Sequence, residues 1–129
     1  MSYLCNEGID VVLSSGTATA TMRAYAVSAG FAGSRTSTFT DIAATAIEGS
    51  GQVLTGVTID AGRIIAAAPV FDDVVDGDDQ ITQVAITIQA SGGDESLLSV
   101  DTNPDLDPTG LSITYQVDPT NGLVAIATA

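Results

Sequence analysis

The second half of the chain alternates between apolar and polar residues with the period of a β-strand. Within residues 82–90, Val84, Ile86 and Ile88 share one face, and a similar alternation recurs over residues 111–117. This pattern is typical of antiparallel strands that bury one face and leave the other in solvent. Both segments are therefore predicted to be half-buried strands.

Turn signals divide the rest of this half into shorter strands. Residues 53–59 alternate, residues 60–62 (Asp-Ala-Gly) suit a tight turn, and residues 63–68 then return as a hairpin partner. An Asn-Gly pair at residues 121–122 marks another turn. The final segment, residues 123–129, is apolar on both faces. It is predicted to lie in the centre of a sandwich or under a neighbouring subunit.

The first third of the chain has weaker patterns. Residues 9–13 alternate and predict a first strand. Residues 17–27 alternate Thr with Ala and predict a second strand, because the threonines disfavour the competing Ala-rich helix. Residues 28–39 form a loop rich in Gly, Ser and Thr, after which Thr40 as an N-cap and Asp41 predict at most a short helical turn.

Turn signals recur roughly every ten residues, as in sandwiches and barrels. The predicted fold class is therefore all-β: an antiparallel β-sandwich or barrel-like domain with at most one short helix. The 129 residues suit a single domain, residues 1–129.

The charge is strongly acidic and unevenly distributed. The chain carries 16 acidic residues, three Arg and no Lys, for a net charge of −13. Residues 1–65 contribute −2 and residues 66–129 contribute −11. Such a surface repels nucleic acid, whose binding needs basic residues, and repels itself unless salt screens it. We interpret the composition as that of a halophilic or marine protein, with an ordinary acidic protein as the alternative.

A dense aspartate cluster precedes the alternating strand over residues 82–90. An EF-hand loop with Gly77 at its sixth position would put Val74 at position 3, which requires an acidic residue, and Gln83 at position 12, which requires Glu. The cluster is therefore predicted to be a solvated hairpin loop that discourages wrong pairing of a strand edge. Its members are Asp72, Asp73, Asp76, Asp78 and Asp79.

A second acidic stretch suits a cation better. Asp101, Asn103 and Asp105 are spaced two residues apart, and Asp107 follows. Oxygen ligands at this spacing can converge on a hard divalent cation when the loop curls around it. Leu106 stands where an EF-hand has Gly, so a solvated turn is the alternative to a structural cation site.

Catalytic motifs are missing from the sequence. The chain has no His and no Lys, which removes the commonest general base and Schiff-base chemistry. The single cysteine, Cys5, is expected to be a small buried apolar residue. We therefore expect no enzyme activity and no cofactor other than that cation. Neither a signal peptide nor a membrane helix is expected.

The three arginines are the only basic side chains. Arg63 is expected to pair with a carboxylate of its own domain. Arg23 and Arg35 lie in the less acidic half and are candidates for contact with an acidic partner. A local ion pair is the alternative for both.

Residues 38–128 resemble a family in the order of several short motifs. Asp41–Ile42 precedes the Glu-Gly-x-Gly turn at residues 48–51, residues 71–73 (Phe-Asp-Asp) precede the alternating strand, and residues 122–124 (Gly-Leu-Val) begin the last strand. This order resembles small β-rich virion proteins of tailed bacteriophages and haloarchaeal tailed viruses. Gln52 departs from the pattern, where an aromatic residue is expected. The first 37 residues have no counterpart.

The resemblance implies a structural protein of a virus particle, made in the host cytoplasm. The first expectation is a capsid decoration or cement protein that binds the major capsid protein and forms a homo-oligomer, with a trimer favoured. The apolar residues Leu123, Val124 and Ile126 would then be buried within the domain or between copies. A tail, neck or fibre-base component is the second hypothesis. An adhesin or sugar-binding module of a halophilic cell is the third.

Overall fold

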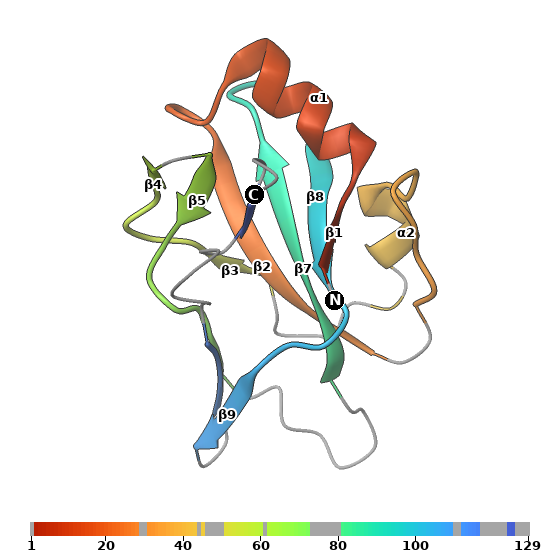
Figure 1. The fold of residues 1–129 in the computed structure, drawn as a ribbon, viewed down its shortest axis with the longest axis vertical. Coiled ribbons are helices and arrows are strands. Elements are labelled where there is room, and N and C mark those ends of the chain that lie inside the picture. Colours follow the sequence, from red (N-terminus) through yellow and green to blue (C-terminus); the bar gives the residue numbers. More distant parts are fainter. Residues whose placement is uncertain are drawn as a thin grey trace.

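A computed structural model shows a chain dominated by antiparallel strands. The structure describes residues 2–28, 31–43, 45, 51–60, 62–72, 81–109, 112–116 and 124–125. Its largest element is a five-stranded sheet (Figure 1). In spatial order the strands are β1 (Ser2–Leu4), β8 (Glu95–Asp101), β7 (Ile81–Gln89), β2 (Thr21–Ser28) and β3 (Gln52–Val53).

Two three-stranded sheets and two helices complete the described elements. One small sheet has the order β6 (Val70–Asp72), β10 (Ser112–Tyr115), β9 (Leu106–Thr109), and the other has the order β11 (Val124–Ala125), β5 (Arg63–Ile65), β4 (Thr58–Asp60). The helices are α1 (Asn6–Ser15) and α2 (Phe39–Ala43). All pairings between these strands are antiparallel, and the predicted all-β class is confirmed.

The main apolar core lies between the five-stranded sheet and the two small sheets. Ala24 of β2 and Ile86 of β7 belong to the same buried cluster as Ile64 of β5, Phe71 of β6 and Tyr115 of β10. Side chains of alternate residues of β2 and β7 face this cluster, because successive side chains of a strand point to opposite faces. The small sheets therefore form a second layer over one face of the large sheet.

A second apolar cluster covers the opposite face of the large sheet. It joins Val27, Ala85 and Val100 from the sheet to Ile42 of α2 and to Phe31. The centre of the sheet is consequently buried on both sides. Ala85 and Thr87 of β7 are fully buried, so the prediction that this strand exposes one whole face to solvent is wrong for its central residues.

The strand β8 was not predicted from the sequence. Five consecutive residues, 96–100, are buried in it, and its neighbours are β7 on one side and β1 on the other. A strand that is covered on both faces needs no alternation of apolar and polar residues. The usual strand signal is therefore absent from β8.

The predicted first strand over residues 9–13 is wrong, because these residues belong to α1. Ile9 and Val12, three residues apart on one face of the helix, pack against the main core, whereas the side chain of Leu13 is 79% exposed. The helix ends at Ser15 and is capped by Gly16, which has a φ of 72° and donates its N–H to the Val12 carbonyl at 3.0 Å. Five alternating residues are too few to distinguish the two periods.

Two residues of α1 fix the helix against β8. A Cβ atom on Gly8 would lie 2.4 Å from Leu98 Cα, so the two backbones meet at a distance that only glycine permits. The Glu7 carboxylate accepts hydrogen bonds from the backbone N–H of Leu97 at 2.8 Å and of Phe39 at 2.9 Å. Glu7 therefore satisfies a donor of β8 and ties that strand to the start of α2.

Several local predictions are confirmed. The hairpin around residues 60–62 forms, with Ile59 opposite Ile64. The second predicted strand forms as β2, although residues 17–19 belong to a turn that precedes it. The short helical turn forms as α2, and it is capped from Thr38 rather than Thr40: the Asp41 carboxylate accepts the Thr38 N–H at 2.8 Å.

The first 37 residues, which the resemblance does not cover, help to build the central sheet. Tyr3 of β1 is paired with Val100 of β8, and β2 makes its long pairing with β7. Among the described residues, no helix has the length and apolarity needed to cross a membrane.

Candidate functional site

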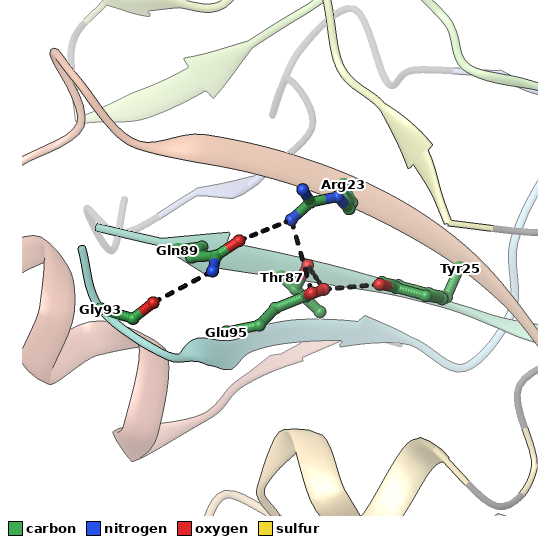
Figure 2. Close-up of polar contacts among 6 residues, drawn as sticks. All are labelled: Arg23, Tyr25, Thr87, Gln89, Gly93 and Glu95. Carbon is green, nitrogen blue, oxygen red and sulfur yellow. Dashed lines mark hydrogen bonds and ion pairs between the residues drawn. The ribbon is translucent and has the colours of Figure 1, made fainter. Parts of the chain in front are cut away.

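Polar side chains gather around Glu95, at the start of β8. The Glu95 Oε2 atom accepts a hydrogen bond of 2.7 Å from the Tyr25 hydroxyl and one of 2.6 Å from the Thr87 hydroxyl. Its Oε1 atom lies 3.4 Å from Nη1 of Arg23. Figure 2 shows how these side chains converge on the carboxylate from β2 and β7. We call these four residues the Glu95 network.

Strand register brings these residues together. Arg23 and Tyr25 share a face of β2, since they are two residues apart. Arg23 is paired with Thr87 on β7, and Thr87 is paired in turn with Leu97 on β8. Glu95, two residues before Leu97, therefore reaches the same face. Partners about 70 positions apart in the sequence meet only because three strands align.

Gln89 extends the contacts towards the β7–β8 turn. Its Oε1 accepts a hydrogen bond of 3.0 Å from Arg23 Nη1, and its Nε2 donates one of 3.0 Å to the Gly93 carbonyl (Figure 2). The turn that leads into Glu95 is thereby held against β7. The geometry gives each polar group an internal partner and ties the strands β2, β7 and β8 to one another.

Burial makes these contacts stronger than surface ion pairs. The side chains of Arg23 and Glu95 are 26% and 15% exposed, and Thr87 is fully buried. A buried hydroxyl group without an acceptor is costly, so Thr87 depends on Glu95. The pKa of Tyr25 is raised to about 12, first by burial and then by the hydrogen bond to Glu95 and the negative charge of that carboxylate, while Arg23 lowers it.

The raised pKa of Tyr25 predicts a loss of stability in strong alkali. The ordinary tyrosine pKa is 10.0, so above that pH the unfolded chain releases the Tyr25 proton while the folded chain retains it. The contribution is complete below pH 10 and is lost as the pH rises towards 12. We expect a slope of up to about 1.4 kcal/mol per pH unit in this window.

Urea unfolding of the wild type and of Tyr25→Phe at several values between pH 9 and pH 11.5 measures this slope. The phenylalanine variant should lose less stability over the same range, since it has no proton to release at this position. Parallel curves for the two proteins would show that Tyr25 has an ordinary pKa in the folded state.

The structure places the residues predicted to contact a partner in different surroundings. Arg23 forms an ion pair with Glu95 of its own chain, which was the alternative to a partner contact. Arg35 is exposed in a turn and stays a candidate contact. Leu123 and Ile126 lie outside the described residues, and Val124 belongs to β11, which is an edge strand of its described sheet. The predicted aspartate loop also lies outside the described residues, except for the backbone of Asp72 in β6.

The first ligand of the predicted cation site has other partners. The Asp101 carboxylate accepts a hydrogen bond of 2.7 Å from the Tyr115 hydroxyl and one of 3.0 Å from the backbone N–H of Asn103. These bonds join the end of β8 to β10 and close the turn after it. Asp101 therefore stabilises the junction of the large sheet with a small one.

The remaining predicted ligands do not gather around Asp101. Asp105 and Asp107 are exposed, and the chain runs extended into β9 between them. An extended chain separates alternate side chains along the strand instead of curling around an ion. Within the described ranges, no three His, Cys, Asp or Glu side chains are grouped so that they could hold a metal ion.

No local pattern in the sequence marks Glu7 and Glu95, the two carboxylates with the most extensive long-range contacts described above. Each stands in a segment whose secondary structure was not predicted, and their partners are far away in the sequence. The expectation for Cys5 is confirmed: it is fully buried, and burial, together with the Glu7 carboxylate, raises the pKa of its thiol to about 11.

Among the residues that the structure describes, four large apolar side chains are exposed. They are Leu13 at 79%, Ile59 at 55%, Val53 at 57% and Val70 at 39% exposure. A pocket of about 220 Å³ lies between the end of α1 and the β4–β5 hairpin. Ile59 lines this pocket, and so does Val12, the residue before Leu13. We call this hollow the α1 pocket.

Comparisons with protein-family models, curated proteins and solved structures found no match to this chain.

Proposed function

We propose that this chain is a non-enzymatic structural protein of a tailed virus particle, and that it decorates the capsid by binding the major capsid protein. The observation that carries this proposal is the exposure of large apolar side chains on helices and strands of an otherwise strongly acidic β-domain. Besides Leu13 and Ile59, these are Val53 of β3 and Val70 of β6, at 57% and 39% exposure, and neither of the two valines lines the α1 pocket. Apolar surface of this kind marks sites of protein association.

The polar groups of the described residues support a structural role. Glu7, Glu95 and Asp101 each hold backbone or side-chain donors from separate elements. Their carboxylates strengthen a small domain that must survive outside a cell. The order of motifs over residues 38–128 supports a place in the virus particle, and the net charge of −13 suits an exterior in salty medium.

Salt should stabilise the protein. The chain is expected to melt about 5–10 °C higher in 3 M KCl than in dilute buffer, because the Debye length shrinks to about 3 Å at molar salt and self-repulsion is screened. The double variant Asp105→Asn/Asp107→Asn removes two negative charges from exposed side chains and so tests the role of self-repulsion. It should melt higher than the wild type in dilute buffer and at a similar temperature in salt. Coincident wild-type melts at the two salt concentrations would refute the halophilic interpretation.

The number of copies of this chain per major capsid subunit tests its place in the particle. Quantitative mass spectrometry of gradient-purified virus particles measures this ratio. Hundreds of copies per particle support decoration of the shell. A handful or a dozen would place the protein in the tail, neck or fibre base instead. No copies would reject the virion proposal and favour a cellular adhesin or sugar-binding module, which a glycan-binding assay then tests.

A further inference from the structure

The α1 pocket has a shape and lining that suit an apolar side chain. Val12 and Thr17 line it from the end of α1, and Ile59, Ile64 and Arg63 line it from the β4–β5 hairpin. Figure 1 shows the hairpin close to the end of α1, beside the beginning of β2. An apolar cavity of about 150 Å³ can hold a benzene molecule. The α1 pocket, at about 220 Å³, has room for a leucine side chain.

A leucine side chain projects from the rim of this pocket. Leu13 follows Val12 on the helix, and successive helical residues point in directions about 100° apart. Val12 therefore faces the pocket while Leu13 points away from it and is 79% exposed. An exposed apolar knob and an open apolar hole thus lie side by side on one patch of the surface.

The charges on this patch are complementary to a second copy of the same patch. Asp10 is exposed and lies one helical turn before Leu13, so the two side chains neighbour each other on the surface of α1. Arg63 contributes its positive charge to the pocket lining. A Leu13 that enters the pocket of another copy brings the Asp10 carboxylate towards that copy's Arg63.

The patch also belongs to the less acidic half of the chain. All of its residues lie between Asp10 and Ile64. Residues 1–65 together carry a charge of only −2, against −11 for residues 66–129. The residues named for the patch include one acidic and one basic side chain, Asp10 and Arg63, so these residues add no net charge to a contact between two copies.

We propose that two copies of this chain associate about a two-fold axis through this patch, with Leu13 of each copy inserted into the α1 pocket of the other. An isologous contact requires a self-complementary surface, in which the knob of one copy meets the hole of the other and the reverse. The inference does not depend on a place in the virus particle. It specifies a dimer contact, whereas the resemblance implies a trimer.

Sedimentation equilibrium of the full chain in 3 M KCl tests the dimer. The wild type is expected at twice the mass of the 13.0 kDa chain, with dissociation in dilute buffer as repulsion between copies returns. Leu13→Asp should weaken the dimer by roughly 100-fold, because two buried leucine contacts are lost. Thr17→Trp should have a similar effect by filling the pocket from within its own chain.

Val53→Asp is the matched control. Val53 is also an exposed apolar residue, at 57%, but it lies on the edge strand β3 and does not line the pocket. This variant should dimerise like the wild type. Thermal melts of all variants confirm that each is folded at the temperature of the measurement, and little change is expected for Leu13→Asp because the side chain is exposed.

Three outcomes would overturn the proposal. They are a wild type that stays monomeric at every salt concentration, a trimer, and a dimer that Leu13→Asp and Thr17→Trp leave unchanged. None of these depends on the copy number in virus particles, so failure of this inference and failure of the virion proposal can be told apart.

Discussion

Replacement of Glu95 by alanine is expected to lower the free energy of unfolding by about 2–4 kcal/mol. The carboxylate accepts hydrogen bonds from Tyr25 and Thr87 and pairs with Arg23. Alanine would leave the fully buried Thr87 hydroxyl without its acceptor and remove a contact shared by three strands. Urea unfolding followed by circular dichroism measures the change.

The neighbouring residue offers a matched control for this substitution. Asp94 is exposed and carries the same charge, so Asp94→Ala should change stability by less than about 0.5 kcal/mol. Glu95→Gln keeps an acceptor oxygen but loses the charge, and it should fall between the two. If Glu95→Ala is no more harmful than Asp94→Ala, the Glu95 network does not stabilise the sheet.

A double-mutant cycle separates the network from general effects of the substitution. Glu95→Ala and Tyr25→Phe should be coupled by about 1 kcal/mol or more, because each removes one end of the same hydrogen bond. Energies that simply add would show that the hydrogen bond of 2.7 Å contributes no stability.

The second large effect is expected for Gly8→Ala. Alanine favours an isolated helix by about 1 kcal/mol over glycine. In the protein, however, the new methyl group would lie 2.4 Å from Leu98 Cα and 2.6 Å from the Leu97 carbonyl oxygen. Both contacts are with backbone, which a rotamer change cannot relieve. We expect α1 to be displaced from β8 and the free energy of unfolding to fall by about 2–4 kcal/mol.

Gly93→Ala controls for the loss of glycine itself. A Cβ atom there would have its closest contact at 3.4 Å, with the Ala90 carbonyl oxygen, in an exposed turn. Stability should therefore change by less than about 1 kcal/mol. An equal effect of the two substitutions would indicate that α1 does not need its close approach to β8.

The Gly8 substitution also connects the fold to the proposed dimer. The α1 pocket forms between the end of α1 and the β4–β5 hairpin, so its shape depends on where the helix rests. A displaced helix would move Val12 and Leu13 together. We therefore expect Gly8→Ala to weaken the dimer even at temperatures where the chain is still folded.

Features that depend on a few neighbouring residues could be predicted from the sequence. The inward side chains of β7 follow from strict alternation, and the β4–β5 hairpin follows from a turn signal between two apolar segments. The short helix α2 follows from Asp41, although its cap is Thr38. The acidic charge follows from composition alone. Each of the structural features depends on contacts within about ten residues, and the charge depends only on residue counts.

What the sequence alone determined is thus the all-β class, the best-patterned strands and the acidic surface. Tertiary structure decided that residues 9–13 belong to a helix, because Gly8 and Glu7 find their partners on β8. It decided that Asp101 bonds Tyr115 instead of gathering with Asp105 and Asp107. It also brought Glu95 to Arg23 and Tyr25 across three strands. Local periodicity carries no information about such pairs, because strand register and burial on both faces are set by the packing of the whole domain.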